Sequence, residues 1–168
     1  MVGVAVERDP ISARANRLLD KGDGTESPRR VQPPTLDAPQ WVAAAAIIVK
    51  AEAVLALRRA PHKPGAGLWE TVSGRILPGE DPLAAVAREV AEECGLTVRI
   101  APRPVDAYAA SRAGAPMVVI CYRAEYVRGR VRRSEEHDAH RWLTVEALGA
   151  LDCPPRLLEA IRRAQRIT

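Results

Sequence analysis

Runs of apolar residues separated by short polar segments divide the chain from residue 41 onward. Residues 41–49, WVAAAAIIV, form an unbroken apolar run of strand length, which is typical of a strand covered on both faces. A second run at residues 53–59, AVLALRR, follows a short turn, so the two runs predict a hairpin. Further strands are expected at residues 69–74, 96–102, 117–127 and 140–143.

The best-specified element is a helix that begins at Pro82. Asp81 can cap its N-terminus, and Pro82 stands at the first helical position, where a missing N–H costs nothing. Gly95 stands where a left-handed residue commonly ends a helix. One apolar stripe at helical spacing is formed by Leu83, Val86, Val90 and Cys94.

The C-terminal part of the chain predicts further helix. Residues 144–151 suit one or two helical turns, and Pro154 and Pro155 open a final helix. The residues of that helix expected to face inward are Leu157, Leu158, Ile161 and Ala164. Strands with helices interspersed among them predict an α/β domain with a mixed sheet.

Residues 1–38 differ from the rest of the chain. They carry charges, glycines and a proline-rich stretch without a sustained apolar period, so we expect an N-terminal extension or linker. Residues 39–168 form the predicted domain, since a chain of 168 residues has room for one domain of ordinary size. Because the sequence contains no Phe, Ala, Val, Leu and Ile must fill most of the core.

Charge and cysteine content narrow the classes of function. A net charge of +4 and a pI near 9.3 suit a polyanionic ligand without establishing nucleic-acid binding. Cys94, Cys121 and Cys153 have no metal-binding spacing, so we interpret them as buried free thiols in a reducing compartment. The sequence shows neither a secretory signal nor an apolar run of membrane-spanning length, so we expect a cytoplasmic protein without a membrane partner. The sequence does not decide whether the protein forms a homodimer.

The polar face of the helix at Pro82 carries Glu89, Glu92 and Glu93. At about 100° per residue these side chains fall within an arc of about 100°, opposite the apolar stripe. Neighbouring carboxylates repel one another, and a divalent cation removes that cost. Mg²⁺ takes oxygen ligands and is usually held by a few carboxylates together with substrate phosphates. An isolated ExxEE is more often a solvated acidic face, so the surrounding residues decide.

Residues 74–96, GRILPGEDPLAAVAREVAEECGL, resemble the Nudix box over its whole length. Seven fixed positions, each met by chance in about 7% of cases, make an accidental match on the order of one in a million. The resemblance continues on both sides of the box, from about Trp41 to the C-terminus. The fixed positions are met by Gly74, Glu80, Arg88, Glu89, Glu92, Glu93 and Gly95, with aliphatic Val90 and Leu96.

The resemblance implies a Nudix-like α/β/α sandwich in which the box forms a catalytic loop–helix–loop. It implies a pyrophosphohydrolase that cleaves a phosphoanhydride in a nucleoside diphosphate-linked substrate. Glu89 is the first candidate for the general base and Glu93 the second, while Glu80 and Arg88 support the site structurally. Mg²⁺, or Mn²⁺ in its place, is implied to be held by Gly74, Glu89, Glu92 and Glu93.

Other residues are candidates for contacts with the substrate. Glu135 and Glu136 lie where a downstream loop of the family often supplies an extra ligand or base, although a polar turn explains them equally well. Cationic or aromatic side chains near the box that could meet the substrate are Arg59, Lys63, Trp69 and Arg75.

The resemblance leaves the substrate open. A nucleoside triphosphate, cleaved to monophosphate and pyrophosphate, is the default. Val72 and Ser73 replace the Pro-Gly that usually precedes the box glycine in oxidised-guanine triphosphatases. Alternatives are a non-catalytic nucleotide-sensing domain and a hydrolase acting on a nucleotide sugar or on RNA 5′ ends. The basic segment 127–133, VRGRVRR, could steer such an RNA end or simply cap a hairpin turn.

We predict that deletion of residues 1–36 leaves a folded, active domain, because that segment has no apolar period and ends in a proline-rich stretch. Circular dichroism, thermal unfolding and turnover of the truncated protein test this. Insoluble or inactive protein would show that the extension belongs to the fold, with Leu18 and Leu19 as its most apolar pair.

Overall fold

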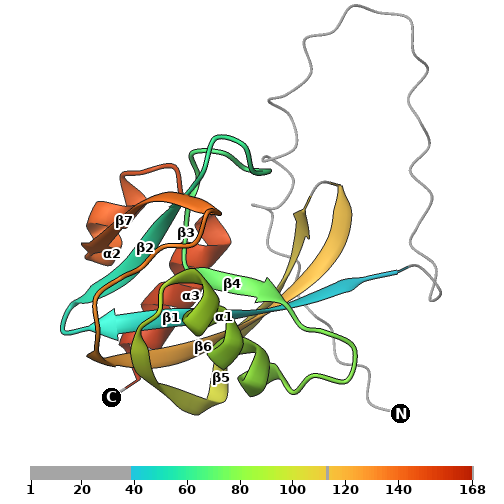
Figure 1. Cartoon of the computed structure of the whole chain (residues 1–168), viewed down its shortest axis with the longest axis horizontal. Helices are drawn as coiled ribbons and strands as arrows, with labels where there is room; N and C mark the ends of the chain where they lie inside the picture. Colours follow the sequence, from blue (N-terminus) through green and yellow to red (C-terminus); the bar gives the residue numbers. More distant parts are fainter. Residues whose placement is uncertain (1–38, 113, 168) are drawn as a thin grey trace, which may run out of the picture. The chain divides into compact units, whose positions relative to one another are not determined.

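The computed structural model describes residues 39–112 and 114–167, so the predicted extension at residues 1–38 lies outside the described residues. All elements expected from the sequence are found in the described ranges, in the predicted order (Figure 1). The elements are β1 (Trp41–Lys50), β2 (Ala53–Arg59), β3 (Trp69–Glu70), β4 (Val72–Arg75), α1 (Pro82–Glu93), β5 (Thr97–Arg112), β6 (Ala115–Arg128), β7 (His137–Leu143), α2 (Val145–Gly149) and α3 (Pro155–Gln165).

The seven strands of the described residues form one mixed sheet in the order β3-β2-β1-β6-β5, with β4 also paired to β1 and β7 to β2. Only β1 and β6 run parallel, and the other pairs are antiparallel. β1 pairs with β6 along one edge and with both β4 and β2 along the other. This central place explains why residues 41–49 form an unbroken apolar run.

Helices cover the two faces of the sheet (Figure 1). Side chains of α2 and α3 pack on one face with Ala43, Ala45 and Ile47. Side chains of α1 pack on the other face with Ala44, Ala46 and Ile48. The structure confirms the expected α/β domain with a mixed sheet between helical layers. The alanines of β1 belong to a strand, against their helical propensity, because burial on both faces outweighs propensity.

The ends of α1 follow the predicted capping chemistry. Asp81 Oδ1 accepts hydrogen bonds from the backbone N–H groups of Leu83 at 2.8 Å and Ala84 at 3.4 Å. Gly95 has a φ of 65°, the left-handed conformation that ends the helix. The buried Val86 and Val90 hold the apolar face of α1 on the sheet. The glutamate-bearing face was expected opposite the apolar stripe, but it adjoins it, because Glu89 and Glu93 are buried beside Val86 and Val90.

The structure differs from the sequence-based expectation at two segments, residues 69–74 and residues 127–133. The segment 69–74 is divided between β3, which pairs with β2, and β4, which pairs with β1. The interpretation of segment 127–133 as a hairpin turn is wrong, because β6 pairs with β1 and β5 whereas β7 pairs with β2. The basic segment instead crosses from one part of the sheet to another.

The three cysteines are buried and free, as the sequence predicted. Within residues 39–112 and 114–167, none of the helices has the length and apolar character needed to cross a membrane.

We predict that Ala46→Leu lowers the free energy of unfolding by about 1–3 kcal/mol, the usual cost of overpacking a core. Ala46 is 1% exposed in the cluster beneath α1, so the added carbons have no space. Val42→Leu is the matched control, because Val42 lies on the same strand and is 39% exposed. Urea unfolding of both variants measures the difference, and equal stabilities would contradict the close packing of α1 on β1.

Candidate functional site

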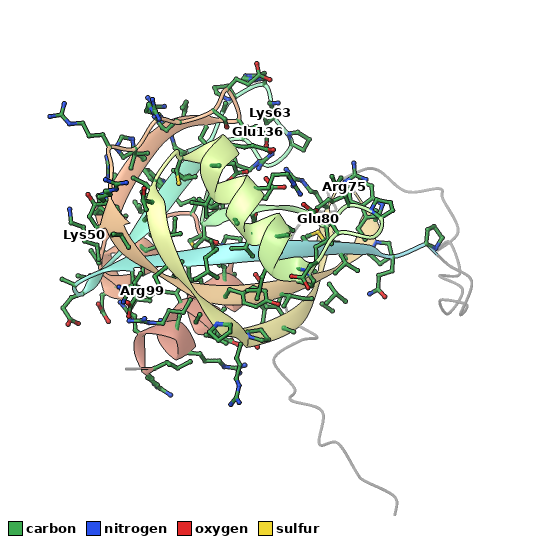
Figure 2. The ribbon with its side chains drawn as sticks, turned by 60° about the horizontal axis from the view of Figure 1, so that its bottom comes forward. Lys50, Lys63, Arg75, Glu80, Arg99 and Glu136 are labelled. Carbon is green, nitrogen blue, oxygen red and sulfur yellow. The ribbon has the colours of Figure 1, made fainter. Side chains whose placement is uncertain are left out.

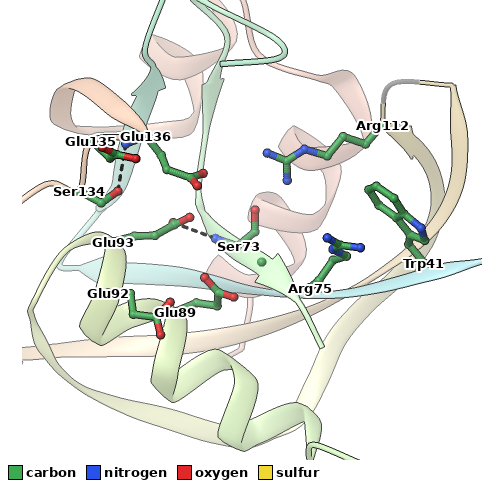
Figure 3. A pocket seen from close by; sticks show the side chains of 11 residues that line it. Trp41, Ser73, Arg75, Glu89, Glu92, Glu93, Arg112, Ser134, Glu135 and Glu136 are labelled. Carbon is green, nitrogen blue, oxygen red and sulfur yellow. Dashed lines mark hydrogen bonds between the residues drawn. The ribbon is translucent and has the colours of Figure 1, made fainter. Parts of the chain in front are cut away.

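The glutamate-bearing face of α1 opens into a cavity of about 460 Å³. The cavity brings α1 together with β4, the start of β1, the end of β5 and the loop before β7 (Figure 3). Its lining residues are Trp41, Ser73, Gly74, Arg75, Glu89, Glu92, Glu93, Arg112, Ser134, Glu135 and Glu136. In Figure 3 the glutamates form one wall and the two arginines lie across from them.

Glu93 is the most deeply placed carboxyl group of this wall. It is 5% exposed, and its Oε2 accepts a hydrogen bond of 3.1 Å from the backbone N–H of Ser73. Burial raises the pKa of Glu93 to about 9 against the lowering effect of that N–H, and the charges of Glu70, Glu89 and Glu136 raise it further. The site therefore holds Glu93 protonated at neutral pH unless a positive charge approaches it.

Glu89 lies one helical turn before Glu93 and is 8% exposed. Burial raises its pKa, the ion pair with Arg88 opposes that shift, and the charges of Glu92 and Glu136 reinforce it. Glu92 points outward with 57% of its side chain exposed. Two of the three glutamates of the predicted acidic face are therefore buried in the site, which a merely solvated face would not require.

Gly74 is in direct contact with the Glu89 carboxylate. A Cβ atom at position 74 would lie 1.9 Å from Glu89 Oε1 and 2.0 Å from its Cδ. Only a glycine permits this approach, because real Cβ contacts are never that short. Gly74 pairs with Ala44 of β1, so the sheet holds its backbone in place. The glycine of the box is thus required by the geometry of the glutamate beside it.

Arg88 organises the acidic residues around it. Its guanidinium donates to Glu80 at 2.8 and 2.9 Å, to Glu89 at 2.6 Å and to the carbonyl oxygen of Arg75 at 3.0 Å. A weaker contact of 3.4 Å reaches Glu92, the partner that helical spacing predicted. The bonds from Arg88 lower the pKa of Glu80 to about 2, so this ion pair persists at any physiological pH. Arg88 thereby joins the loop before α1 to β4 and to Glu89.

The loop before β7 completes the acidic wall. Glu135 and Glu136 both line the cavity, and Lys63 lies 3.4 Å from the first and 3.6 Å from the second. Figure 2 shows Lys63 and Glu136 beside each other. Lys63 is therefore paired with acidic residues of the site and does not line the cavity itself.

Arg59 lies deeper than a surface phosphate-binding residue. It is 4% exposed and donates to the carbonyl oxygen of Pro64 at 2.7 Å and to Glu70 Oε1 at 2.5 Å. The same Glu70 oxygen lies 3.0 Å from His137 Nε2, and the buried Nδ1 of that histidine has no hydrogen-bond partner among the described residues. The Arg59 guanidinium also lies 3.7 Å from Glu136. This cluster anchors the loop that carries Glu136.

A second cavity of about 300 Å³ adjoins the first, and Ser73 and Arg112 line both. Its lining is mostly apolar and includes Leu68, Met117 and Leu157. Arg59 and Glu70 contribute polar groups, but their charges are already paired with each other. The site therefore joins a highly charged compartment to a small apolar one.

The predicted candidates separate into distinct environments. Arg75 lines the first cavity, with its guanidinium 4.2 Å from the centre of the Trp41 ring. Trp69 is 6% exposed and belongs to the core, where Arg58 and Arg141 contact its ring. Sequence reasoning did not single out Arg112 as a site residue. The strand expected at residues 96–102 stops short of Arg112, whereas β5 continues to it, so the local pattern did not indicate this residue.

The donor groups suit a hard divalent cation, because the carboxylates of five glutamates line one cavity. Among the described residues, no three acidic, histidine or cysteine side chains already converge closely enough to hold an ion. The cause lies in their present partners: Arg88 holds Glu89, Ser73 holds Glu93, and Glu92 faces solvent. Binding a cation would exchange these contacts through side-chain rotation on a fixed helix.

Comparison with known proteins agrees with this geometry. The family model described as the NUDIX domain matches residues 39–164. A putative 8-oxo-dGTP diphosphatase 2 of Mycobacterium tuberculosis is 32% identical over 120 residues, covering 68% of this chain and 80% of the relative. An octanoyltransferase of Myxococcus xanthus is 37% identical over 117 residues, but the match covers only 32% of that protein.

Solved structures share the fold. A MutT protein of Methanosarcina mazei superposes with a TM-score of 0.70 at 27% identity, covering 79% of this chain and 97% of the other. A Caenorhabditis elegans Ap4A hydrolase superposes with a TM-score of 0.66 at 22% identity, covering 75% and 96% of the two chains, which is a likeness of fold alone.

We predict that, without divalent metal, the protein loses stability as the pH rises from about 5 towards 9. The pKa of Glu93 is 4.5 in a free chain and about 9 in the fold. Between these values the folded state binds more protons, so the stabilisation is complete below the lower value and is lost towards the upper one. Each pKa unit corresponds to about 1.4 kcal/mol, and we expect a loss of at least about 1 kcal/mol.

Urea unfolding in chelator across this pH range measures the effect. Glu93→Gln should flatten the dependence, whereas Glu92→Gln, which removes a mostly exposed carboxylate of the same helix, should keep it. An unchanged slope in Glu93→Gln would contradict the raised pKa of this carboxyl group.

Proposed function

The chain belongs to the Nudix family of pyrophosphohydrolases, and from that membership we propose that it hydrolyses a phosphoanhydride in a nucleotide with the help of Mg²⁺ or Mn²⁺. The default substrate is a nucleoside triphosphate, cleaved to monophosphate and pyrophosphate. The observation that carries the proposal is the wall of carboxylates around Gly74, with arginines on the opposite side of the same cavity (Figure 3).

The metal would be held by the carboxylates of Glu89, Glu92 and Glu93 and by the backbone carbonyl of Gly74. A divalent cation bound there would neutralise phosphate charge and lower the pKa of a bound water. The raised pKa of Glu93 supports this assignment, because a buried carboxyl group needs a positive charge to ionise. Glu136 is the further ligand we favour, since it lines the same cavity and is held there by Lys63 and Arg59.

Glu89 is the residue we assign to the removal of a proton from the attacking water. Burial raises its pKa, which brings a carboxylate closer to the range in which a general base works. In the absence of a cation, Arg88 donates to Glu89 and the missing side chain at Gly74 leaves space for its carboxylate against β4. Glu93 is less suited to this step, because it is the more deeply buried of the two and its Oε2 already accepts the backbone N–H of Ser73.

The two cavities divide the substrate between them. Phosphates suit the first cavity, where Arg75 supplies positive charge opposite the glutamates. The nucleoside suits the second, mostly apolar cavity, where Tyr108 and Met117 offer flat or polarisable surface. This division supports a nucleotide over inorganic pyrophosphate, which would leave the second cavity unfilled.

We predict that hydrolysis of nucleoside triphosphates disappears in chelator and returns when Mg²⁺ or Mn²⁺ is added. Glu93→Gln should lower kcat by at least about 10²-fold, because electrostatic groups at such sites contribute on that scale. The assay is a panel of the common nucleoside triphosphates, with each product identified by chromatography.

The matched control is Glu146→Gln, which removes an exposed carboxylate of α2 that does not line this cavity. It should keep full activity, and circular dichroism should show that both variants are folded. Activity that survives exhaustive chelation, or full activity in Glu93→Gln, would place the chemistry elsewhere.

A further inference from the structure

Arg112 occupies an unusual position for a charged residue. It is the last residue of β5, paired with Ala115 across the turn of the long β5–β6 hairpin. Tyr108 and Ala110 precede it at two-residue spacing, and both side chains pack against the core cluster under α3. Because alternate residues of a strand share a face, Arg112 continues an inward-facing row. All three residues of this row line the second cavity.

The surroundings of Arg112 supply no partner for its charge. Among the described residues its guanidinium forms no ion pair, although five glutamates line the first cavity with it. Figure 3 shows its side chain extended into the cavity from the wall opposite the glutamates. Arg59, the other arginine of the second cavity, is by contrast fully engaged with Glu70 and Pro64. Among the described residues, Arg75 of the first cavity also forms no ion pair, but it lies over the Trp41 ring and does not line the second cavity, so Arg112 is the unpaired cation that lines both.

Arg112 lies between the two cavities, so it can contact only the part of a ligand that crosses from one cavity to the other. Only Ser73 and Arg112 line both cavities, so a ligand that fills both must pass these two residues. In a nucleotide, the group at that boundary is the phosphate attached to the sugar. A guanidinium is planar and presents paired N–H donors, which match two oxygens of one phosphate.

We propose that Arg112 is a substrate-binding residue that grips the phosphate next to the nucleoside and so sets which anhydride bond faces the glutamates. The inference rests on the proposed function, since it takes the ligand to be a nucleotide. A phosphate held at the boundary places the next phosphate beside Gly74 and Glu89. Loss of this contact should weaken binding more than it slows the bond-breaking step, because Arg112 lies across the cavity from the glutamates.

Calorimetric titration with α,β-methylene-ATP and Mg²⁺ tests the contact without hydrolysis. Arg112→Ala should weaken binding at least about 10-fold, and Arg112→Lys should recover part of the loss, because a lysine keeps the charge without the paired donors. Arg103→Ala is the matched control: it removes an exposed arginine of the same strand and should change the affinity less than twofold. With a hydrolysed triphosphate, Arg112→Ala should raise KM by a larger factor than it lowers kcat.

The outcomes separate this inference from the proposed function. Wild-type turnover with equal affinities in wild type and Arg112→Ala would overturn the role of Arg112 and leave the hydrolase intact. Wild-type protein that neither binds the analogue nor hydrolyses any triphosphate would remove the proposed function and the inference together. A variant that lost thermal stability but kept its affinity would show that Arg112 only offsets the charge of the glutamates, which also contradicts the proposal.

Discussion

Mutual repulsion among carboxylates is the constraint around which the site is organised. Five glutamates line one cavity, and two of them are nearly buried, where their charges cost most. The protein limits this cost in three ways: Arg88 pairs with Glu89 and Glu80, Lys63 and Arg59 pair with Glu136, and Glu93 takes up a proton. A divalent cation carries more positive charge than a proton or one of these basic side chains, so it can replace them as the partner of the carboxylates. A cation bound there would therefore take the place of the proton on Glu93 and of the Arg88 contact with Glu89.

The sheet gives this crowded cavity a rigid frame. β1 contacts α1 on one face and α2 and α3 on the other through small alanines, so the helices approach the sheet closely. β4 is held on the same strand and carries Ser73 and Gly74 directly opposite α1. The acidic residues of α1 and the backbone of β4 thus belong to one packed unit. The loop that carries Glu136 is joined to that unit through the buried Arg59 and His137 and the half-buried Glu70.

Local sequence patterns predicted the helices and strands, because each element depends on residues within its own segment, such as an apolar run, a capping residue or a glycine. The apolar run at residues 41–49, the Asp81 cap and Gly95 all appear in the structure as expected. The resemblance to the Nudix box likewise pointed to Glu89, Glu92 and Glu93, which line the first cavity. Long-range contacts were not predictable in this way. Nothing near Arg59 in the sequence indicates that Glu70 and His137 bury it, and nothing near Arg112 indicates that the hairpin carries it to the cavity. Both depend on strand pairing between distant segments.

Gly74 belongs both to the central sheet and to the acidic site. Its missing side chain is the space that the Glu89 carboxylate occupies, and its backbone is a rung of the central sheet. One methyl group added there would have to push Glu89 away from β4 or push β4 away from α1. A substitution at this position therefore moves the Glu89 carboxylate, and with it the acidic wall of the site. A homologue that lacked this glycine would need a different partner for its glutamate, and hence a differently built site.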